Sequence, residues 1–256
     1  LGTFFAEGIP ANGYKTYSLT DESPAQVENS LKGEEQANYI ENKWYKVSFD
    51  KKKGCIRSIW DKTNKRELVD DQSENGFGSY VYERYDKEQS YRYLKEYIYD
   101  KYKNSHYQIT GKSTYLDERT KGIHESPWNM EFHVENHKSS IRGVLTPSAS
   151  VGEEKHTAGL TVTLYENMPC IDVKLSVINK PATEEPEAGW IALPFKTKSP
   201  EYRVGRIGSV IDPAKDLIEG SQFNYIWSNS GIMIKDKEYS VGVCPIDAPA
   251  FVLGDL

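Results

Sequence analysis

The chain has little cysteine, no long apolar run and no excess of positive charge. Its three cysteines, Cys55, Cys170 and Cys244, form no C-x-x-C pair, so the sequence suggests neither a disulfide framework nor a cysteine metal site and leaves the compartment undetermined. Its longest apolar runs have the length of a strand, far below the roughly 20 residues that cross a bilayer. A net charge of -6 argues against the basic face that a nucleic acid requires. We therefore expect no membrane or nucleic-acid partner, and neutral ligands such as sugars stay open.

Tyrosine, in contrast, is common. The 256 residues include 18 tyrosines, and aromatic residues make up 12% of the chain, which suits a soluble sheet protein. The most informative stretch is residues 40–70, where Tyr45, Val47 and Phe49 alternate with polar residues. A polar turn ending in Gly54 follows, and residues 55–60 then form a second extended run. This pattern predicts two antiparallel strands.

The same alternation recurs along the chain and is cleanest at residues 171–178, where every second residue is apolar. Residues 90–102 are the only helical candidate of any length, and Pro213 after Asp212 indicates a short helical turn. The other expected strands are residues 14–19, 130–134, 140–145, 160–164, 190–195, 201–207, 231–235 and 239–244.

About a dozen expected strands with almost no helix predict an all-β protein, built as a large antiparallel two-sheet sandwich. We place this sandwich at residues 37–256. Residues 1–36 mix Gly, Pro and polar residues, and we interpret them as an arm and linker with one strand. The chain starts at Leu1 rather than at Met and stops just after an apolar stretch, so we expect it to be a piece of a longer polypeptide.

Four stretches of the sequence are informative when they are taken together, in their order along the chain. They are residues 9–17 (IPANGYKTY), 40–70, 75–82 (NGFGSYVY) and 187–195 (EAGWIALPF). Together they resemble the segment that joins the sandwiches and the C-terminal β-sandwich region of family 38 glycoside hydrolases, the α-mannosidases. The resemblance implies a galactose-mutarotase-like supersandwich. It also implies that the nucleophilic Asp and the zinc ligands lie in an N-terminal α/β catalytic domain of the same polypeptide, because the motifs of that domain do not match this sequence.

The resemblance points to one site residue, Tyr80. It matches the tyrosine of a Gly-x-Tyr-aromatic stretch that, in the family, lies at the interface with the catalytic domain and reaches toward the substrate. Glu83 and Arg84 stand where the family often has Arg-Pro, and a purely packing role for Tyr80 stays open. The residues themselves suggest Trp227 and Tyr225 as a sugar-stacking pair, because an aromatic face complements the C–H side of a pyranose; core packing is the alternative.

Spacing identifies no catalytic or metal-binding residues. His133 and His137 would lie about 13 Å apart on a strand, too far for one metal ion. His156 has no partner spacing, and we interpret it as a surface or turn residue. A retaining glycosidase needs two carboxyl groups about 5 Å apart, and the sequence does not pair any of its 38 acidic residues.

The leading hypothesis is a non-catalytic β-sandwich portion of a bacterial-type, α-mannosidase-like glycoside hydrolase. Its expected partners are the catalytic domain and a mannoside-type glycan. Two alternatives stay open. One is a stand-alone carbohydrate-binding module, and the other is a mutarotase-type sugar epimerase, which needs a histidine with a carboxylate, such as His124 and Glu125.

Overall fold

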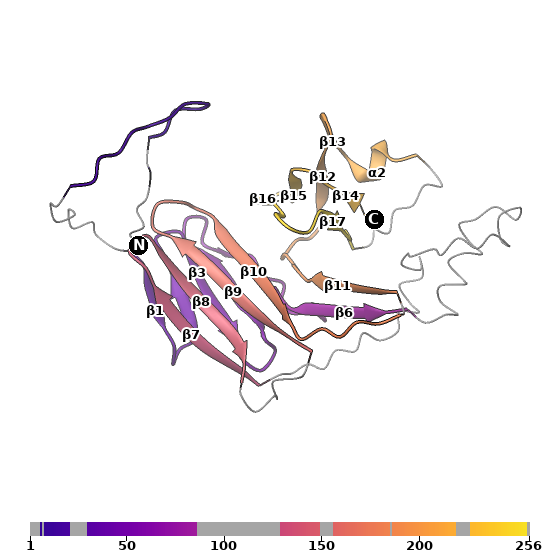
Figure 1. Ribbon diagram of the computed structural model, residues 1–256. Coiled ribbons are helices and arrows are strands. Elements are labelled where there is room, and N and C mark those ends of the chain that lie inside the picture. The colour runs from indigo at the N-terminus through magenta and orange to yellow at the C-terminus, as the bar shows by residue number, and fades with distance from the viewer. Residues whose placement is uncertain are drawn as a thin grey trace, which may run out of the picture. The chain divides into compact units, whose positions relative to one another are not determined.

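The computed structural model describes residues 6, 8–20, 30–85, 129–148, 156–184, 186–218 and 226–254 (Figure 1). Within these residues, seventeen strands and one four-residue helix make up the regular structure. The strands form antiparallel sheets, so the predicted all-β sandwich is confirmed. The chain divides into two compact units, each described by itself below. Unit 1 comprises Leu1–Tyr82, Ile123–Thr183 and Ala188–Phe195, and unit 2 comprises Glu83–Gly122, Glu184–Glu187 and Lys196–Leu256.

The first sheet of unit 1 has five antiparallel strands in chain order, from β1 to β5. The hairpin predicted within residues 40–70 is confirmed as its centre, the pair β3 and β4. Gly54 ends the turn with a φ of 63°, a conformation that glycine adopts without a steric penalty. The Asp50 carboxylate accepts hydrogen bonds from the backbone of Lys52 and Lys53 and so stabilises the turn. The strands are β1 (Lys32–Glu34), β2 (Tyr39–Glu41), β3 (Tyr45–Asp50), β4 (Cys55–Asp61) and β5 (Arg66–Glu67).

The second sheet of unit 1 has four long strands in the order β10-β9-β8-β7. All four confirm strands that the alternation predicted. β10 pairs with β9 over its whole length, with Ile171 opposite Leu164. Its apolar face is only partly buried, however, and Val177 is 44% exposed, because β10 is an edge strand of this sheet. The strands are β7 (Met130–Asn136), β8 (Ser140–Pro147), β9 (Thr157–Tyr165) and β10 (Ile171–Ile178).

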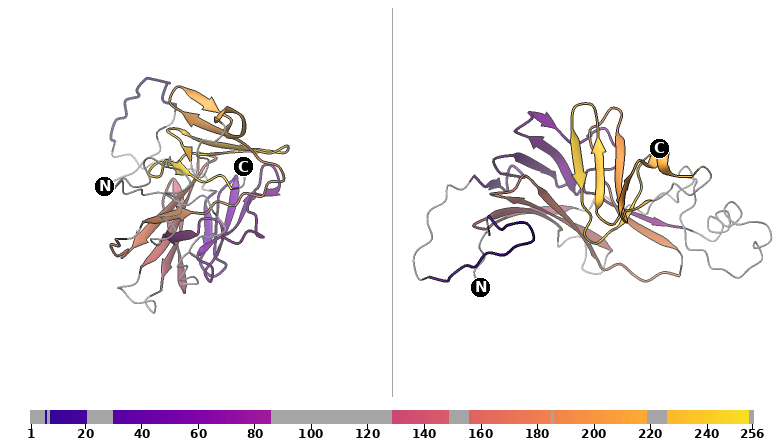
Figure 2. Two further views of the ribbon diagram at one scale, coloured as in Figure 1. Left: turned by 90° about the vertical axis from the view of Figure 1, so that its right-hand side faces the viewer. Right: turned by 90° about the horizontal axis from the view of Figure 1, so that it is seen from above.

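The two sheets of unit 1 pack face to face, and the left view of Figure 2 shows them as two layers. Phe49 from the first sheet and Phe132 from the second approach to 4.6 Å between ring centroids. Gly143 makes room for this pair, since a Cβ there would lie 2.6 Å from the Phe49 ring. The apolar side chains removed from water between the layers stabilise the unit. The buried set includes Ile40, Val47, Ile59, Ile141, Leu145, Leu160, Val162 and Leu164.

A separate two-stranded sheet consists of β6 (Tyr80–Arg84) and β11 (Glu187–Ile191). The strand predicted at residues 190–195 therefore starts earlier and ends earlier than expected. Pro194 has no backbone N–H to donate to a ladder, which disfavours a regular strand there. Its carbonyl still accepts a hydrogen bond from the backbone of Asp70, 2.9 Å away.

Unit 2 is smaller in its described part. Its main sheet has the order β13-β12-β15-β16, and a two-stranded sheet pairs β14 with β17. A core of four buried residues, Val204, Ile226, Ile232 and Leu253, holds these strands together. Three strands confirm predicted ones. The bounds are β12 (Glu201–Arg206), β13 (Ser209–Ile211), β14 (Ile226–Trp227), β15 (Gly231–Lys235), β16 (Ser240–Val243) and β17 (Ala250–Phe251).

Short-range predictions had mixed outcomes. The helical turn is confirmed as α2 (Pro213–Asp216), with Asp212 at its N-cap. The strand at residues 14–19 is wrong: these residues form no strand, and Tyr14 is 87% exposed. An alternating segment becomes a strand only where a neighbour supplies ladder hydrogen bonds, and none of the described strands does so here. The helical candidate at residues 90–102 lies outside the described residues.

The division into an arm at 1–36 and a sandwich at 37–256 stays a prediction, although β1 already falls within the expected arm. Among the residues that the structure describes, no helix has the length and apolar character needed to cross a bilayer.

Candidate functional site

Tyr80 lies at the start of β6 in unit 1 and is almost completely buried, with 8% of its surface exposed. Its hydroxyl lies 3.2 Å from Nε2 of His156, a hydrogen-bond distance. The Tyr80 and Tyr82 rings are stacked, with their centroids 6.2 Å apart, and the imidazole of His156 meets both rings edge-on. The ammonium of Lys180 lies 5.9 Å from the centre of the Tyr82 ring. We call these four residues the Tyr80 cluster.

The backbone around Tyr80 is positioned by its glycines and by β11. Gly78 has a φ of 79°, and its N–H donates to the carbonyl of Ala192 at 2.6 Å. The N–H of Ala192 in turn donates to the carbonyl of Ser79. Gly189 lets the Tyr80 ring approach β11 closely, because a Cβ at that position would lie 3.0 Å from the ring. The glycine of the Gly-x-Tyr motif therefore has a steric reason, because Gly78 adopts a backbone conformation that other residues rarely take.

The chemistry of the Tyr80 cluster suits hydrogen bonding rather than acid catalysis by a carboxyl pair. A phenol and an imidazole each can donate and accept, as sugar hydroxyls do. The neighbouring Tyr82 and His156 rings and the hydrogen-bond distance to His156 limit the movement of the Tyr80 hydroxyl. Such preorganisation lowers the entropy cost of binding a ligand.

The second predicted site lies in unit 2. Trp227, on β14, is 54% exposed, and Tyr225 lies outside the described residues. The next residue, Ser228, is buried and holds the following turn: its hydroxyl lies 2.8 Å from the Gly205 carbonyl and accepts from the N–H of Gly231 at 2.8 Å. Trp227 therefore projects from a firmly anchored backbone.

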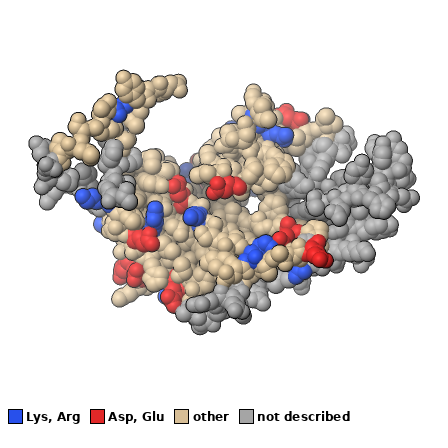
Figure 3. All heavy atoms as spheres, viewed as in Figure 1, with Lys and Arg blue, Asp and Glu red and all other residues tan. Residues whose placement is uncertain are grey.

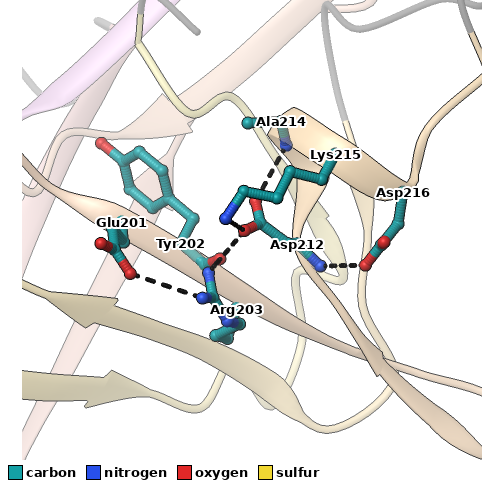
Figure 4. A network of polar contacts seen from close by, with 7 residues as sticks. All are labelled: Glu201, Tyr202, Arg203, Asp212, Ala214, Lys215 and Asp216. Carbon is teal, nitrogen blue, oxygen red and sulfur yellow. Dashed lines mark hydrogen bonds and ion pairs between the residues drawn. The ribbon is translucent and has the colours of Figure 1, made fainter.

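A network of polar contacts in unit 2 surrounds Asp212 (Figure 4). The Asp212 carboxylate accepts from the N–H of Ala214 and lies 3.0 Å from the guanidinium of Arg203 and 3.1 Å from the ammonium of Lys215. Its own N–H donates to Asp216 at 2.7 Å. This network joins the first turn of α2 to β12.

Electrostatics make Asp212 an anion at neutral pH. The hydrogen bond from Lys215 is the largest cause that lowers the pKa of the Asp212 carboxyl below its usual value, and the Ala214 N–H and Arg203 add to it. A carboxyl held ionised in this way cannot serve as a general acid near neutrality. Its role is to cap α2 and to fix Arg203.

No metal centre forms among the residues that the structure describes, where no group of three or more His, Cys, Asp or Glu side chains could hold an ion. His133 lies on β7, and His137 directly follows the end of that strand. Each meets different carboxylates, Glu131 at 3.6 Å for His133 and Glu135 at 3.7 Å for His137. Figure 3 shows acidic and basic side chains interspersed over the described part of one face.

A comparison with protein families decides what kind of domain carries these features. A family model described as "Glycosyl hydrolases family 38 C-terminal domain" matches residues 40–245. The chain belongs to this family. A comparison with curated proteins found no match. The resemblance inferred from the sequence motifs is therefore confirmed, and the match includes Tyr80 and Trp227 but not residues 9–17.

Within this family 38 C-terminal domain, the two described site residues belong to different units, Tyr80 to unit 1 and Trp227 to unit 2. Sugar binding by either residue stays a prediction. The residue that sequence reasoning missed is His156, which was expected to be an ordinary surface or turn residue. It contacts Tyr80 across 76 positions of sequence, and no local pattern signals a contact of that range.

Proposed function

We propose that the chain is the non-catalytic β-sandwich portion of an α-mannosidase-like glycoside hydrolase. In this proposal it supports a catalytic domain of the same polypeptide, which holds the nucleophile and the zinc ion, and it contributes Tyr80 to the sugar site. The observation that supports the proposal is the family match over residues 40–245, because the family is described as the C-terminal domain of family 38 glycosyl hydrolases. The carbohydrate-binding-module and epimerase alternatives stay predictions.

The Tyr80 cluster supports the second part of the proposal. Gly189 leaves room for the Tyr80 ring, and His156 lies within hydrogen-bond distance of its hydroxyl, so the position of this phenol hydroxyl is set by residues far apart in sequence. A fixed hydroxyl of this kind is what recognition of a sugar hydroxyl requires.

The first test assays the purified 256-residue chain with an aryl α-mannoside. We expect no hydrolysis above a mock preparation, because the proposal places the nucleophile elsewhere. Turnover by the chain that is absent from the mock preparation would overturn the non-catalytic role.

The second test uses the intact hydrolase and the substitution Tyr80→Phe, which keeps the ring and removes the hydroxyl. Losing one hydrogen bond to a neutral ligand predicts a KM for a mannoside raised about 3- to 10-fold. Tyr82→Phe is the matched control, since Tyr82 stacks in the same cluster. An unchanged KM for Tyr80→Phe contradicts the sugar contact but leaves the non-catalytic role standing.

A further inference from the structure

The five-stranded sheet of unit 1 has a second face, which points away from the four-stranded sheet. Ile40, Val47 and Ile59 point into the core, so their neighbours along each strand point outward. The strand register then defines two rows across this outward face. One row is Tyr39, Ser48 and Ser58, and the other is Glu41, Lys46, Trp60 and Glu67. We call these seven residues the outer platform.

Trp60 is the centre of the outer platform. It lies next to the last residue of β4, directly opposite Lys46, and it is 40% exposed. An exposed indole on a strand forgoes much of the stabilisation that its burial would provide. Tyr39 lies two strands away and one row along, about 12 Å from Trp60 between Cα atoms by sheet geometry. The two aromatic residues therefore span more than the width of one pyranose ring.

The charges of the outer platform are matched within the sheet. Lys62 forms an ion pair with Glu41 at 3.1 Å. Glu67 accepts hydrogen bonds from the Ser58 hydroxyl at 2.5 Å and from the N–H of Ile59 at 2.8 Å. The ammonium of Lys46 lies 4.1 Å from the centre of the Tyr39 ring, a cation–π contact. The two glutamates and the two lysines of this surface, Lys62 included, carry no net formal charge, which suits an uncharged ligand better than a polyanion.

We propose that the outer platform binds a neutral glycan. The C–H side of a pyranose stacks on the Trp60 indole, because the negative face of the ring attracts the slightly positive C–H groups. Lys46 and the Ser48 and Tyr39 hydroxyls then meet the sugar hydroxyls on either side. A protein partner is disfavoured, because the centre of a protein interface is depleted of charged residues, whereas Trp60 is flanked by Lys46 and Glu67 in its own row.

This site does not include Tyr80, and it does not rest on the proposed function. The class of ligand agrees with a domain of glycosyl hydrolases.

The test titrates the full 256-residue chain with mannotriose, cellotriose and maltotriose by isothermal titration calorimetry. We expect at least one trisaccharide to bind, with an affinity reduced about tenfold or more by Trp60→Ala. Lys46→Met, which keeps the aliphatic stem, should reduce the affinity less. Tyr14→Ala is the control, because it removes another exposed aromatic ring, at a position outside the outer platform, and should leave the affinity unchanged. Circular dichroism spectra check that each variant is folded.

Two results overturn the proposal. One is a folded wild-type chain that binds none of the three trisaccharides at millimolar concentration. The other is a Trp60→Ala variant that binds as tightly as wild type. If Trp60→Ala instead changes the sedimentation of the chain and no glycan binds, the outer platform is a protein interface and the proposal is equally wrong.

Discussion

Unit 1 and unit 2 are both β-structures, but different interactions dominate in each. Unit 1 places two sheets face to face over long strands, and its core contains fully buried residues such as Ile141 and Leu145. Unit 2 has shorter strands around four buried residues. Its turns and its helix are fixed by polar groups, the Ser228 hydroxyl and the Asp212 carboxylate.

The difference shows how strand length sets the means of stabilisation. A strand of eight residues can present four side chains to a core, whereas a strand of two can present one. Where little apolar area is available, hydrogen bonds from side chains to backbone groups contribute a larger share of the stability. We therefore expect core substitutions to lower the free energy of unfolding most in unit 1. Loss of a single side-chain hydrogen bond should take a larger share of the stability in unit 2.

The largest effect is expected for a matched pair of isoleucines. Ile141→Ala in unit 1 and Ile232→Ala in unit 2 remove the same atoms from buried sites. Substitution of a buried isoleucine by alanine generally lowers the free energy of unfolding by about 2–5 kcal/mol, and we expect Ile141→Ala near the upper end of this range and Ile232→Ala near its lower end. Urea unfolding measures both. The comparison between the units fails if Ile232→Ala costs more than Ile141→Ala.

Asn42 stabilises unit 1 through hydrogen bonds between its side chain and backbone groups. It is fully buried, its Oδ1 accepts from the N–H groups of Trp44 and Tyr45, and its Nδ2 donates to the Tyr165 carbonyl. Asn42→Ala leaves three backbone groups without this partner and should cost about 2–3 kcal/mol. Asn229→Ala, at an exposed position, serves as the control in the same urea experiment. A cost below that of the control would show that water replaces the Asn42 side chain.

Ser228 has the corresponding role in unit 2, where its side chain bonds to backbone groups. Its hydroxyl accepts from the Gly231 N–H and lies within hydrogen-bond distance of the Gly205 and Gly231 carbonyls. We expect Ser228→Ala to lower the unfolding free energy by about 1–2 kcal/mol, against less than about 0.5 for the exposed Ser209→Ala. Equal effects of the two substitutions would mean that the turn after β14 does not depend on this hydroxyl.

The smallest effect concerns pH. The Asp212 carboxyl has a lower pKa in the folded state than the ordinary value of 3.8, with the Lys215 hydrogen bond as the largest cause. Its contribution is therefore complete above that ordinary value and is lost as the pH falls through the lower folded-state pKa. We expect the loss of stability below pH 4 to be shallower in Asp212→Asn than in wild type. Identical slopes in unfolding experiments between pH 5 and 2 would contradict this role.

Much of the fold was predictable, because alternation is a local property. The hairpin of β3 and β4, the four strands of the second sheet and the helical turn at Pro213 all follow from period, glycine and proline. The same criterion failed at residues 14–19, because a period of two describes a strand's faces but not its partner. Nor does alternation show that the apolar face of β10 is only partly buried, since an edge position is not visible in the strand's own sequence.

The candidate sites were less predictable for the same reason. Tyr80 could be selected by its motif, but its contact with His156 depends on a fold that joins distant segments. Trp60 was predicted to lie in a strand, and its direction followed only once Ile59 was seen to point into the core. Neighbours on different strands are set by register, which single-strand patterns leave undefined.

The sequence by itself determined where the chain is extended, where it turns and which family it belongs to, because these depend on side chains close together along the backbone. Tertiary structure alone decided which face of each strand meets water, which imidazole fixes the Tyr80 hydroxyl and which rings stand together on the outer platform. Those outcomes follow from long-range strand pairing, where the free energy of burying apolar surface selects one register among several that local propensities allow equally.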